Sequence, residues 1–430
     1  MPSFASLLAM LPRCCCVPCT DPTESTELYR SAIALAPGGE DIVPEERLPQ
    51  FDRIIDRRGS DSIKWSLYGD DVLPMWVADM DFRCPDPVIE ALQHRVEHGI
   101  YGYVREPSGI REVLVDRLKR RFDWTIAPES IVFLPNVYVG FHLAAHAVTQ
   151  AADSVLITPP VYFPILDVPG NAGIRGKLCE MLCSDGLQYA IDFSRLEASI
   201  DPKSRLFILC NPHNPVGRVY TRTELERLAE LCAKHNLIIC SDEIHADFVY
   251  EGHRHVPIAS LSPEIDRQTI TLMSPAKSFN VAGIPFAFAV ISDPDLRSRY
   301  ENAKMGLVAH PGVFGFAAAL AAYRDGDNWL DELVAYLQAN RDEAAAFVHD
   351  RLPGVEMTPL QGTYLAWLDC RAARIAGNVH EHLLKTGRIA TNDGALFGSG
   401  GEGFVRLNLA CPRTQMLDGL ERIRSALASR

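Results

Sequence analysis

The sequence predicts an α/β protein whose main sheet is covered by helices on both faces. From about residue 153, short apolar runs alternate with amphipathic stretches, which is typical of strands and helices that follow one another along the chain. After about residue 325 the pattern changes, which indicates a smaller α+β domain. A chain of 430 residues with 47% hydrophobic residues is long enough for about two or three domains.

Each element follows from a local pattern. Apolar runs predict buried strands at 154–158, 206–210, 237–241, 270–273 and 286–291. Amphipathic stretches predict helices at 223–235, 294–305 and 312–324. The last part of the chain predicts a helix at 329–351, closed by Pro353 and Gly354, strands at 363–368 and 403–409, and a final helix from about 413. The resulting organisation is a loosely ordered extension at 1–45, a segment at 46–82 that contributes to the small domain, a large domain at 83–325 and a small domain at 326–430.

Charge and cysteine content narrow the class of protein. The formal net charge of −13 disfavours nonspecific binding to nucleic acid or anionic membranes, and no apolar run of about 18 residues predicts a membrane span. Four of the 12 cysteines are Cys14, Cys15, Cys16 and Cys19. The others are scattered, which is typical of reduced thiols in a cytoplasmic protein. Because no second pair of ligands follows Cys16 and Cys19, we expect no metal site there; a lipidated cluster is the other alternative.

Three polar residues follow three of the predicted strands. Asn214 comes after the strand at 206–210, Asp242 directly ends the strand at 237–241, and Lys277 comes shortly after the strand at 270–273. In an α/β sheet, the carboxyl ends of the strands are where functional residues gather. Each residue also has a structural explanation: a tight turn around Asn214, a helix cap for Asp242, and a surface lysine for Lys277. Their joint occurrence favours a site.

These residues lie in longer motifs that resemble a known family. The motifs are Trp76-Val77-Ala78-Asp79-Met80-Asp81-Phe82, Ser241-Asp242-Glu243-Ile244-His245, Lys277-Ser278-Phe279-Asn280, Thr363-Tyr364-Leu365-Ala366-Trp367-Leu368-Asp369 and Arg406-Leu407-Asn408. From about residue 50 to the end, the chain resembles the fold type I pyridoxal-phosphate (PLP) enzymes of the class I/II aminotransferase superfamily. Within it, the chain is most similar to the MalY/PatB-like cystathionine β-lyase branch. The resemblance implies a large PLP-binding domain with a mostly parallel seven-stranded sheet.

The resemblance also assigns roles around the PLP ring. Lys277 would carry PLP as a Schiff base and move the α-proton of the substrate. Asp242 would pair with the pyridine nitrogen, and Asn214 would donate to the phenolic oxygen. His245 stands where many aminotransferases have a tyrosine. Tyr162 would stack on the ring, although it is also compatible with a core aromatic residue.

Further residues are assigned to the phosphate and the substrate. Val137 and Tyr138 open an apolar helical stretch whose backbone N–H groups suit an anion, and Ser274 matches a phosphate-binding hydroxyl. Tyr103 matches a tyrosine that the family contributes from the neighbouring subunit. Arg406 would bind the substrate carboxylate through a bidentate fork; its alternative is a structural arginine beside an acidic residue.

Two positions depart from the wider family. Ala276 stands before the lysine, where relatives often have Ser or Thr, and this removes one hydroxyl from the phosphate site. Pro285 stands where many aminotransferases have an arginine, eight residues after the lysine. The lyase branch tends to lack that arginine, so its absence favours the lyase over the aminotransferase.

The resemblance therefore implies a cytoplasmic, homodimeric enzyme with shared active sites that acts on a small amino acid. The expected reaction is PLP-dependent β-elimination from a cysteine S-conjugate or cystathionine-like substrate, which gives a thiol, pyruvate and ammonia. The alternatives are an aminotransferase, an oxidative or decarboxylating variant of the same scaffold, and a noncatalytic regulatory PLP-binding protein. No nucleic acid, membrane or metal is expected as a partner.

Overall fold

A computed structural model describes residues 50–429. Clustering of contacts separates residues 1–53 from residues 54–430. The predicted loose extension at 1–45 and the cysteine cluster at 14–19 lie outside the described residues. No helix within residues 50–429 combines the length and the apolar character that a membrane span requires.

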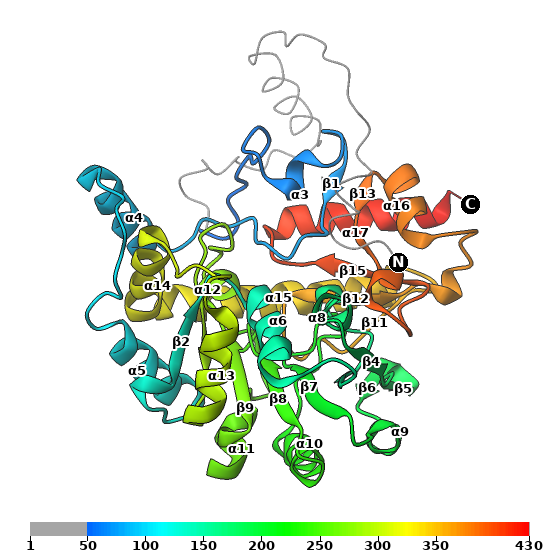
Figure 1. The fold of residues 1–430 in the computed structure, drawn as a ribbon. Helices are drawn as coiled ribbons and strands as arrows, with labels where there is room; N and C mark the ends of the chain where they lie inside the picture. Colours follow the sequence, from blue (N-terminus) through cyan, green and yellow to red (C-terminus); the bar gives the residue numbers. More distant parts are fainter. Residues whose placement is uncertain (1–49, 430) are drawn as a thin grey trace. The chain divides into compact units, whose positions relative to one another are not determined.

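The larger sheet has seven strands in the order β2-β10-β9-β8-β7-β3-β4 (Figure 1). They are β2 (Ile131–Leu134), β3 (Ser154–Ile157), β4 (Arg175–Leu178), β7 (Ser204–Cys210), β8 (Ile238–Asp242), β9 (Thr269–Met273) and β10 (Ala287–Val290). β10 is antiparallel to both of its neighbours, β2 and β9, and all other strand pairs in this sheet are parallel. The predicted α/β fold class, with a mostly parallel sheet of seven strands, is confirmed.

Helices cover both faces of this sheet because the side chains of each strand alternate between the faces. In β7, Ile208 packs with α6 (Val137–Val148) and α13 (Pro294–Lys304). Its neighbour Phe207 packs on the other face with α10 (Arg222–Lys234). Both faces are therefore apolar, which is why the strands read as continuous hydrophobic runs rather than alternating ones.

The helix bounds follow local signals. At the start of α10, the Thr221 side chain accepts from Glu224 N at 3.3 Å while the Glu224 carboxylate accepts from Thr221 N at 2.8 Å, which is a capping box. The other helices of the larger part are α4 (Asp86–His98), α5 (Ile110–Phe122), α7 (Phe163–Leu166), α8 (Val168–Ala172), α9 (Phe193–Ser199), α11 (Pro263–Arg267), α12 (Pro275–Ser278) and α14 (Val313–Asp325). Short 3-10 turns are η2 (Pro128–Ser130), η3 (Asp185–Leu187), η4 (Ile258–Leu261), η5 (Arg371–Ala373) and η6 (Gly394–Phe397).

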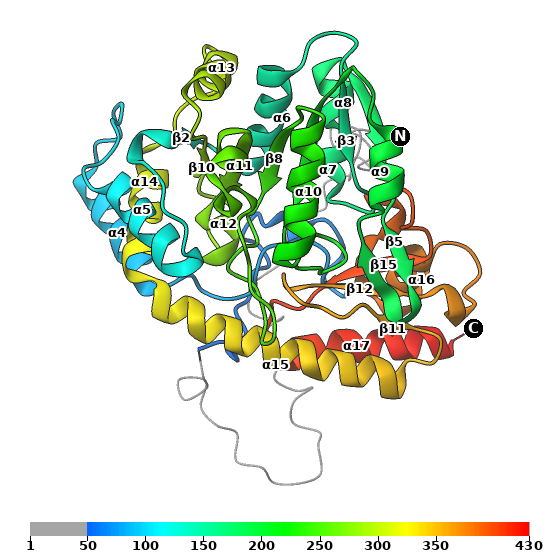
Figure 2. The same ribbon diagram turned by 90° about the horizontal axis from the view of Figure 1, so that it is seen from below.

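The C-terminal part is built on a four-stranded antiparallel sheet in the order β11-β12-β15-β14. Its elements are α15 (Asp327–Arg351), β11 (Glu356–Met357), β12 (Leu365–Asp369), α16 (Val379–Gly387), β13 (Ile389–Ala390), β14 (Asn392–Asp393), β15 (Phe404–Asn408) and α17 (Arg413–Ala428). Helices α15 and α17 lie side by side (Figure 2).

An early segment of the chain joins this C-terminal part. After α3 (Ile63–Ser66), strand β1 (Leu73–Pro74) pairs in parallel with β13, so that Leu73 lies opposite Ile389. The pairing brings residues 73–74 beside the C-terminal part, and the predicted domain organisation stays a prediction.

Sequence patterns did not predict the polar strands. Strand β4 lies at one edge of the large sheet, and three of its four residues are exposed, so no apolar run marks it. The hairpin of β5 (Leu182–Ser184) and β6 (Gln188–Ala190) is similarly missing from the predicted elements. An edge strand buries little surface, and its sequence is therefore less constrained.

Candidate active site

Three neighbouring strands bring Asn214, Asp242 and Lys277 to one edge of the large sheet. Asp242 is the last residue of β8, Asn214 lies in the loop after β7, and Lys277 lies in the short helix α12 after β9. In the register of the sheet, Asp242 is paired with Cys210 of β7 on one side and with Leu272 of β9 on the other. The predicted convergence at the strand ends is thus what the parallel topology produces.

Asp242 is a buried carboxylate that forms no ion pair within the described part of the chain. Its Oδ1 accepts a hydrogen bond of 3.1 Å from the backbone N–H of Ile244. Burial raises the pKa of Asp242 to about 7, and the neighbouring Glu243 acts in the same direction. A protonated ring nitrogen would relieve this unfavourable state, because a buried charge requires a partner of opposite sign.

Lys277 is held by a backbone carbonyl rather than by a carboxylate. Its Nζ donates a 2.7 Å hydrogen bond to Ala78 O. Desolvation lowers the pKa of Lys277 to about 8, and the charge of Arg406 contributes to this shift, while Asp79 and Asp242 oppose it. A lysine with a lowered pKa has a substantial neutral fraction near neutral pH, which is the form that acts as a nucleophile or base.

Arg406, on β15, is a buried cation with neutral partners. Its Nη1 donates to Asn214 Oδ1 at 2.9 Å, and its Nη2 donates to Asn392 Oδ1 at 2.6 Å and to Trp76 O at 3.0 Å. Its Nε is buried and has no hydrogen-bond partner in the part of the chain that the structure describes. Burial lowers the pKa of Arg406 to about 10. No acidic residue within 50–429 pairs with it, so the alternative of a structural ion pair is not what the structure shows.

Tyr162 and His245 border the same group of residues. Tyr162 is half-buried just before α7, and its pKa is raised to about 12 by burial and by the charge of Asp242. His245 is buried, its Nδ1 has no hydrogen-bond partner, and its ring lies edge-on to Tyr364 with centroids 5.6 Å apart. Burial keeps the pKa of His245 well below its ordinary value, so the imidazole is neutral.

The predicted phosphate-binding residues lie at two helix starts. Val137 and Tyr138 form the first turn of α6, whose N–H groups have no acceptor within the helix. The N-cap Asn136 accepts from Val139 N at 2.8 Å. Ser274 caps α12: its Oγ donates to Phe286 O at 2.6 Å and accepts from Ala276 N at 3.1 Å. The Ser274 hydroxyl therefore has internal partners, and its role toward a phosphate stays a prediction.

Tyr103 is not brought to the other residues by this single chain. Its side chain is fully exposed, and it makes no hydrogen bond within the described residues. This is compatible with the expected role in a neighbouring subunit, which stays a prediction.

The segment 76–81 is the part of the site whose contacts the sequence did not reveal. It contains no regular strand, yet side chains from distant parts of the chain bind its successive carbonyl groups. The donors are Arg406 to Trp76 O, Asn408 to Val77 O, Lys277 and Tyr364 to Ala78 O, Asn408 and Lys64 to Asp79 O, and Asn280 and Arg57 to Met80 O. We name this segment the carbonyl strap. Tyr364, Asn280 and Asn408 lie in motifs that the sequence shows, but only the fold shows that these motifs converge on the carbonyl strap.

The donor set fits PLP bound with an amino acid. Within residues 50–429, Asp242 has no cation partner, and His245 Nδ1 and Arg406 Nε are buried without a hydrogen-bond partner. A protonated pyridine nitrogen and a substrate carboxylate would complement the acidic and the basic group respectively. Buried polar atoms are normally paired, so these unpaired groups point to a ligand of mixed charge. No group of three or more His, Cys, Asp or Glu side chains in the described ranges could hold a metal ion.

Comparisons with known proteins identify the family of the chain. Residues 71–423 match the model of the family described as aminotransferase class I and II. The chain is 40% identical to cystathionine β-lyase PatB of Bacillus subtilis, over 88% of this chain and all of the relative. It is also similar to the solved structure of cystalysin from Treponema denticola, which contains PLP, with a TM-score of 0.85 and 31% identity. The match covers 89% of this chain and 99% of cystalysin.

A PLP-bound candidate aminotransferase from Clostridium difficile 630 is similar in structure, with a TM-score of 0.86 and 37% identity. The match covers 88% of this chain and 100% of the aminotransferase. The family model spans residues 71–423, the range in which the motifs of the site lie. The two solved structures named above contain PLP, and the chain belongs to the aminotransferase class I and II family.

Proposed function

We propose that this protein is a PLP-dependent carbon–sulfur β-lyase that acts on a cysteine S-conjugate or a cystathionine-like amino acid. Elimination gives a thiol and 2-aminoacrylate, and the latter takes up water to give pyruvate and ammonia. The observation that carries the proposal is the buried guanidinium of Arg406, which has no carboxylate partner within residues 50–429 and contacts Asn214 in the group that contains Lys277 and Asp242. The names of the relatives support the carbon–sulfur lyase class.

Residues of this chain would hold PLP at three points. Asp242 would pair with the ring nitrogen, Asn214 and His245 would border the phenolic oxygen, and the first turn of α6 with Ser274 would receive the phosphate. When bound, PLP supplies an electron-withdrawing ring that stabilises negative charge at the substrate α-carbon. The negative charge of Asp242 maintains the positive charge on the ring nitrogen, on which that withdrawal depends.

Lys277 acts as the base. At a pKa of about 8, its amine is partly neutral at physiological pH and can accept the proton of the α-carbon at Nζ. The hydrogen bond to Ala78 O fixes the direction of Nζ, so that the amine is positioned before the proton moves. Loss of the α-proton then allows the bond between the β-carbon and sulfur to break, with the sulfur leaving as thiolate.

Arg406 binds and orients the substrate. Its fork matches the planar carboxylate of an amino acid, and Asn214, Asn392 and Trp76 O hold the guanidinium plane. When Arg406 fixes the carboxylate, the α-proton of the substrate can be directed toward Lys277. This orientation lowers the entropic part of the activation barrier.

An aminotransferase is the second candidate, because a solved relative bears that description and the same residues would serve. Pro285 in place of the arginine found in many aminotransferases favours the lyase. Incubation of the purified protein with a panel of cysteine conjugates, with and without a keto acid, separates them. A lyase releases pyruvate and thiol without a keto acid, whereas turnover that requires a keto acid would replace the lyase by the aminotransferase.

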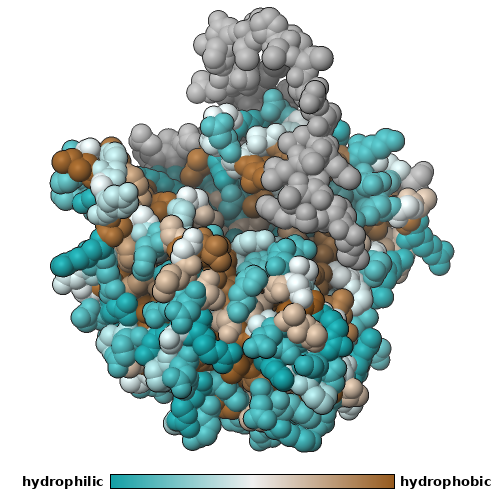
Figure 3. Space-filling model, in the orientation of Figure 1, coloured by the Kyte–Doolittle hydropathy of each residue, from teal (hydrophilic) through white to brown (hydrophobic). Residues whose placement is uncertain are grey.

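The assembly we propose is a homodimer in the cytoplasm. Apolar surface is exposed at α4 (Figure 3). The exposed apolar side chains here are Val96, near the end of α4, and Ile100 and Tyr101, just after it. Tyr103 stands beside them in sequence and is fully exposed. Exposed apolar patches mark interaction surfaces, which supports burial of this region in a partner. The cytoplasmic location is supported by the eight described cysteines, all of which are free thiols.

A further inference from the structure

Helix α12, which carries Lys277, is a single turn of four residues. A helix of this length is not stable by itself, so contacts with the rest of the fold set the direction of its side chains. At its start, the Ser274 hydroxyl donates to Phe286 O at 2.6 Å. At its end, Ser278 Oγ donates to Asp247 Oδ2 at 2.6 Å. The turn is therefore tied at one end to the segment before β10 and at the other end to the loop after β8.

Asp247 is a buried carboxylate in an ion pair. Nη2 of Arg117, in α5, donates to both oxygens of Asp247 at 2.8 Å, and both side chains are almost completely buried. Burial alone would raise the pKa of Asp247, but the charges of Arg117 and Arg121 outweigh it and lower that pKa. The pKa of Arg117 is likewise raised by Asp247 in spite of its burial. Both members of the pair are therefore charged, and Ser278 donates to an ionised acceptor.

Arg117 contacts the end of the lysine turn a second time. Its guanidinium lies over the ring of Phe279, the residue after α12, at 5.4 Å from the ring centroid, and over the ring of Tyr323 at 4.8 Å. The other face of this arrangement is closed by Trp329 of α15, whose ring is stacked on Phe279 with centroids 6.3 Å apart. Cation–π contacts of a buried arginine are stabilising, so the last residues of the turn are fixed by both a hydrogen bond and a packed ring.

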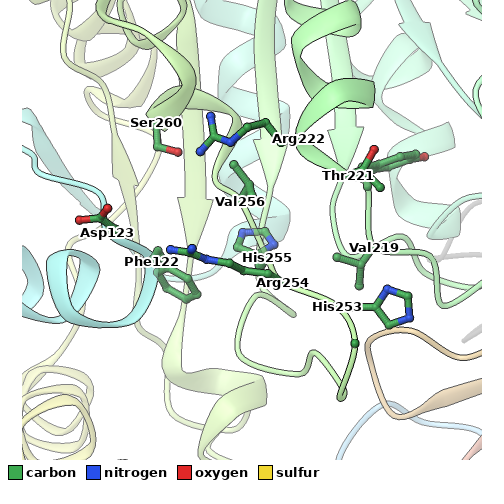
Figure 4. A pocket seen from close by; sticks show the side chains of 12 residues that line it. Phe122, Asp123, Val219, Thr221, Arg222, His253, Arg254, His255, Val256 and Ser260 are labelled. Carbon is green, nitrogen blue, oxygen red and sulfur yellow. The ribbon is translucent and has the colours of Figure 1, made fainter.

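The ion pair is kept away from solvent. A surface cleft of about 430 Å³ lies at the end of α5 (Figure 4). Phe122 and His255 line it, with their rings packed edge-on and centroids 5.4 Å apart, and His255 Nε2 lies 2.7 Å from the buried Glu243 Oε2. The ion pair and Ser278 border a separate cavity of only about 10 Å³. Bulk water therefore does not compete with Ser278 for the carboxylate, and the hydrogen bond keeps a fixed geometry.

We propose that Ser278 and Asp247 are positioning residues that hold the turn of α12 so that Lys277 Nζ can attach to PLP and take the α-proton. This proposal rests on the proposed function and adds two residues to it that touch neither PLP nor the substrate. The hydrogen bond to Ala78 O restrains the tip of the lysine side chain. Asp247 restrains its backbone end, because Lys277 and Ser278 are neighbours in one turn.

The test compares Ser278→Ala with the parent in the full chain. The rate at which PLP becomes covalently bound to Lys277 is measured by borohydride reduction at timed intervals and mass spectrometry. We expect this rate and kcat to fall on the order of tenfold with KM little changed, because the reacting atoms are misplaced. In the Lys277→Ala background, where PLP binds without the covalent bond, Ser278→Ala should leave the dissociation constant of PLP unchanged in a fluorescence titration.

Two variants control for general effects. Ser278→Thr keeps the hydroxyl, its methyl group has the adjacent cavity of about 10 Å³, and it should attach PLP nearly as fast as the parent. Ser130→Ala removes another buried hydroxyl, one that donates to Ala127 O at 2.5 Å, and should change neither quantity. Thermal unfolding identifies the variants that fold. Asp247→Asn would leave the buried charge of Arg117 without its partner and destabilise the fold, which is why Ser278 carries the test.

Failure of the positioning role and failure of the proposed function give different results. If the parent acquires no covalent PLP at Lys277, the proposed function fails. If the parent is labelled and folded Ser278→Ala acquires the label equally fast, only the positioning role is wrong. Equal losses in Ser278→Ala and Ser278→Thr, or a weaker PLP affinity caused by Ser278→Ala in the Lys277→Ala background, would also overturn the positioning role, because the effect would then come from a general distortion of the site.

Discussion

Lys277 Nζ donates a 2.7 Å hydrogen bond to the carbonyl of Ala78, which lies 199 residues earlier in the chain. Tyr364 Oη donates to the same carbonyl at 3.0 Å. The proposed base is therefore fixed by the carbonyl strap, whose own conformation depends on side chains from both the large sheet and the C-terminal part. The position of the base is thus linked to the folding of segments far apart in the sequence.

Asn408 tests the importance of the carbonyl strap. Its amide donates to Val77 O at 2.6 Å and to Asp79 O at 2.7 Å, so Asn408→Ala leaves two carbonyl groups without these donors. We expect a loss of about 1–3 kcal/mol in the free energy of unfolding, together with a lower kcat. Denaturant unfolding and steady-state kinetics measure both. Asn302→Ala, an exposed substitution in α13, should change neither; equal effects of the two substitutions would contradict a special role for the strap.

Arg406→Lys tests the recognition of the substrate carboxylate. Lysine keeps the charge but cannot reproduce the fork held by Asn214 and Asn392. We expect kcat/KM to fall by about 100-fold or more, mostly through KM, while the affinity for PLP changes little. Arg371→Lys, an exposed arginine paired with Asp369, is the control. An unchanged KM in Arg406→Lys would show that the carboxylate binds elsewhere.

Asp242 predicts a pH dependence of stability in PLP-free protein. Its pKa is raised by burial from 3.8 to about 7, so the folded state binds the proton more tightly than the unfolded state. Between about pH 4 and 7, rising pH therefore lowers the free energy of unfolding. Asp242→Asn removes this loss and should be more stable than the wild type at pH 8, by on the order of 1–3 kcal/mol, but not at pH 4. Asp70→Asn, a substitution of an exposed aspartate, is the control for the loss of one carboxylate. If the free energy of unfolding of Asp242→Asn changed with pH as it does in the wild type, Asp242 would not be the cause of the pH dependence.

Shared active sites predict complementation between inactive subunits. Lys277→Ala removes the base, and Tyr103→Phe removes the hydroxyl of the exposed tyrosine that would enter the partner's site. Refolding the two variants together should give about a quarter of the wild-type activity, since half of the dimers are mixed and each mixed dimer has one intact site. Activity no greater than that of the separate variants would mean that Tyr103 does not act across the interface.

The residues at the strand ends could be predicted from the sequence because buried parallel strands appear as continuous apolar runs. Asp242 and Lys277 follow apolar runs that are buried on both faces, and this burial makes the runs continuous. The family and fold class expected from the motifs are confirmed. Relatives described as cystathionine β-lyases and a solved structure that contains PLP agree with the proposed activity and cofactor. The individual roles of the site residues stay predictions.

The other features of the site could not be predicted from the sequence, because they depend on tertiary contacts between residues that are far apart in the chain. The carbonyl strap has no periodic pattern, and its donors Asn408 and Tyr364 are more than 280 residues away from it. Likewise, the Glu243–His255 contact joins a strand end to a loop whose path no local signal predicts. Strand β4 was missed for the opposite reason, since its exposed edge position needs no apolar residues.

Covalent mapping of PLP on the protein tests the central claim most directly. The PLP-loaded protein is reduced with borohydride, digested, and analysed by mass spectrometry for the peptide that carries the reduced cofactor. We predict that the label lies on Lys277 Nζ, one of only a few lysines in the chain, and that Lys277→Ala protein acquires no stoichiometric label. A stoichiometric label on another lysine, or an unlabelled Lys277 in fully loaded protein, would contradict the account.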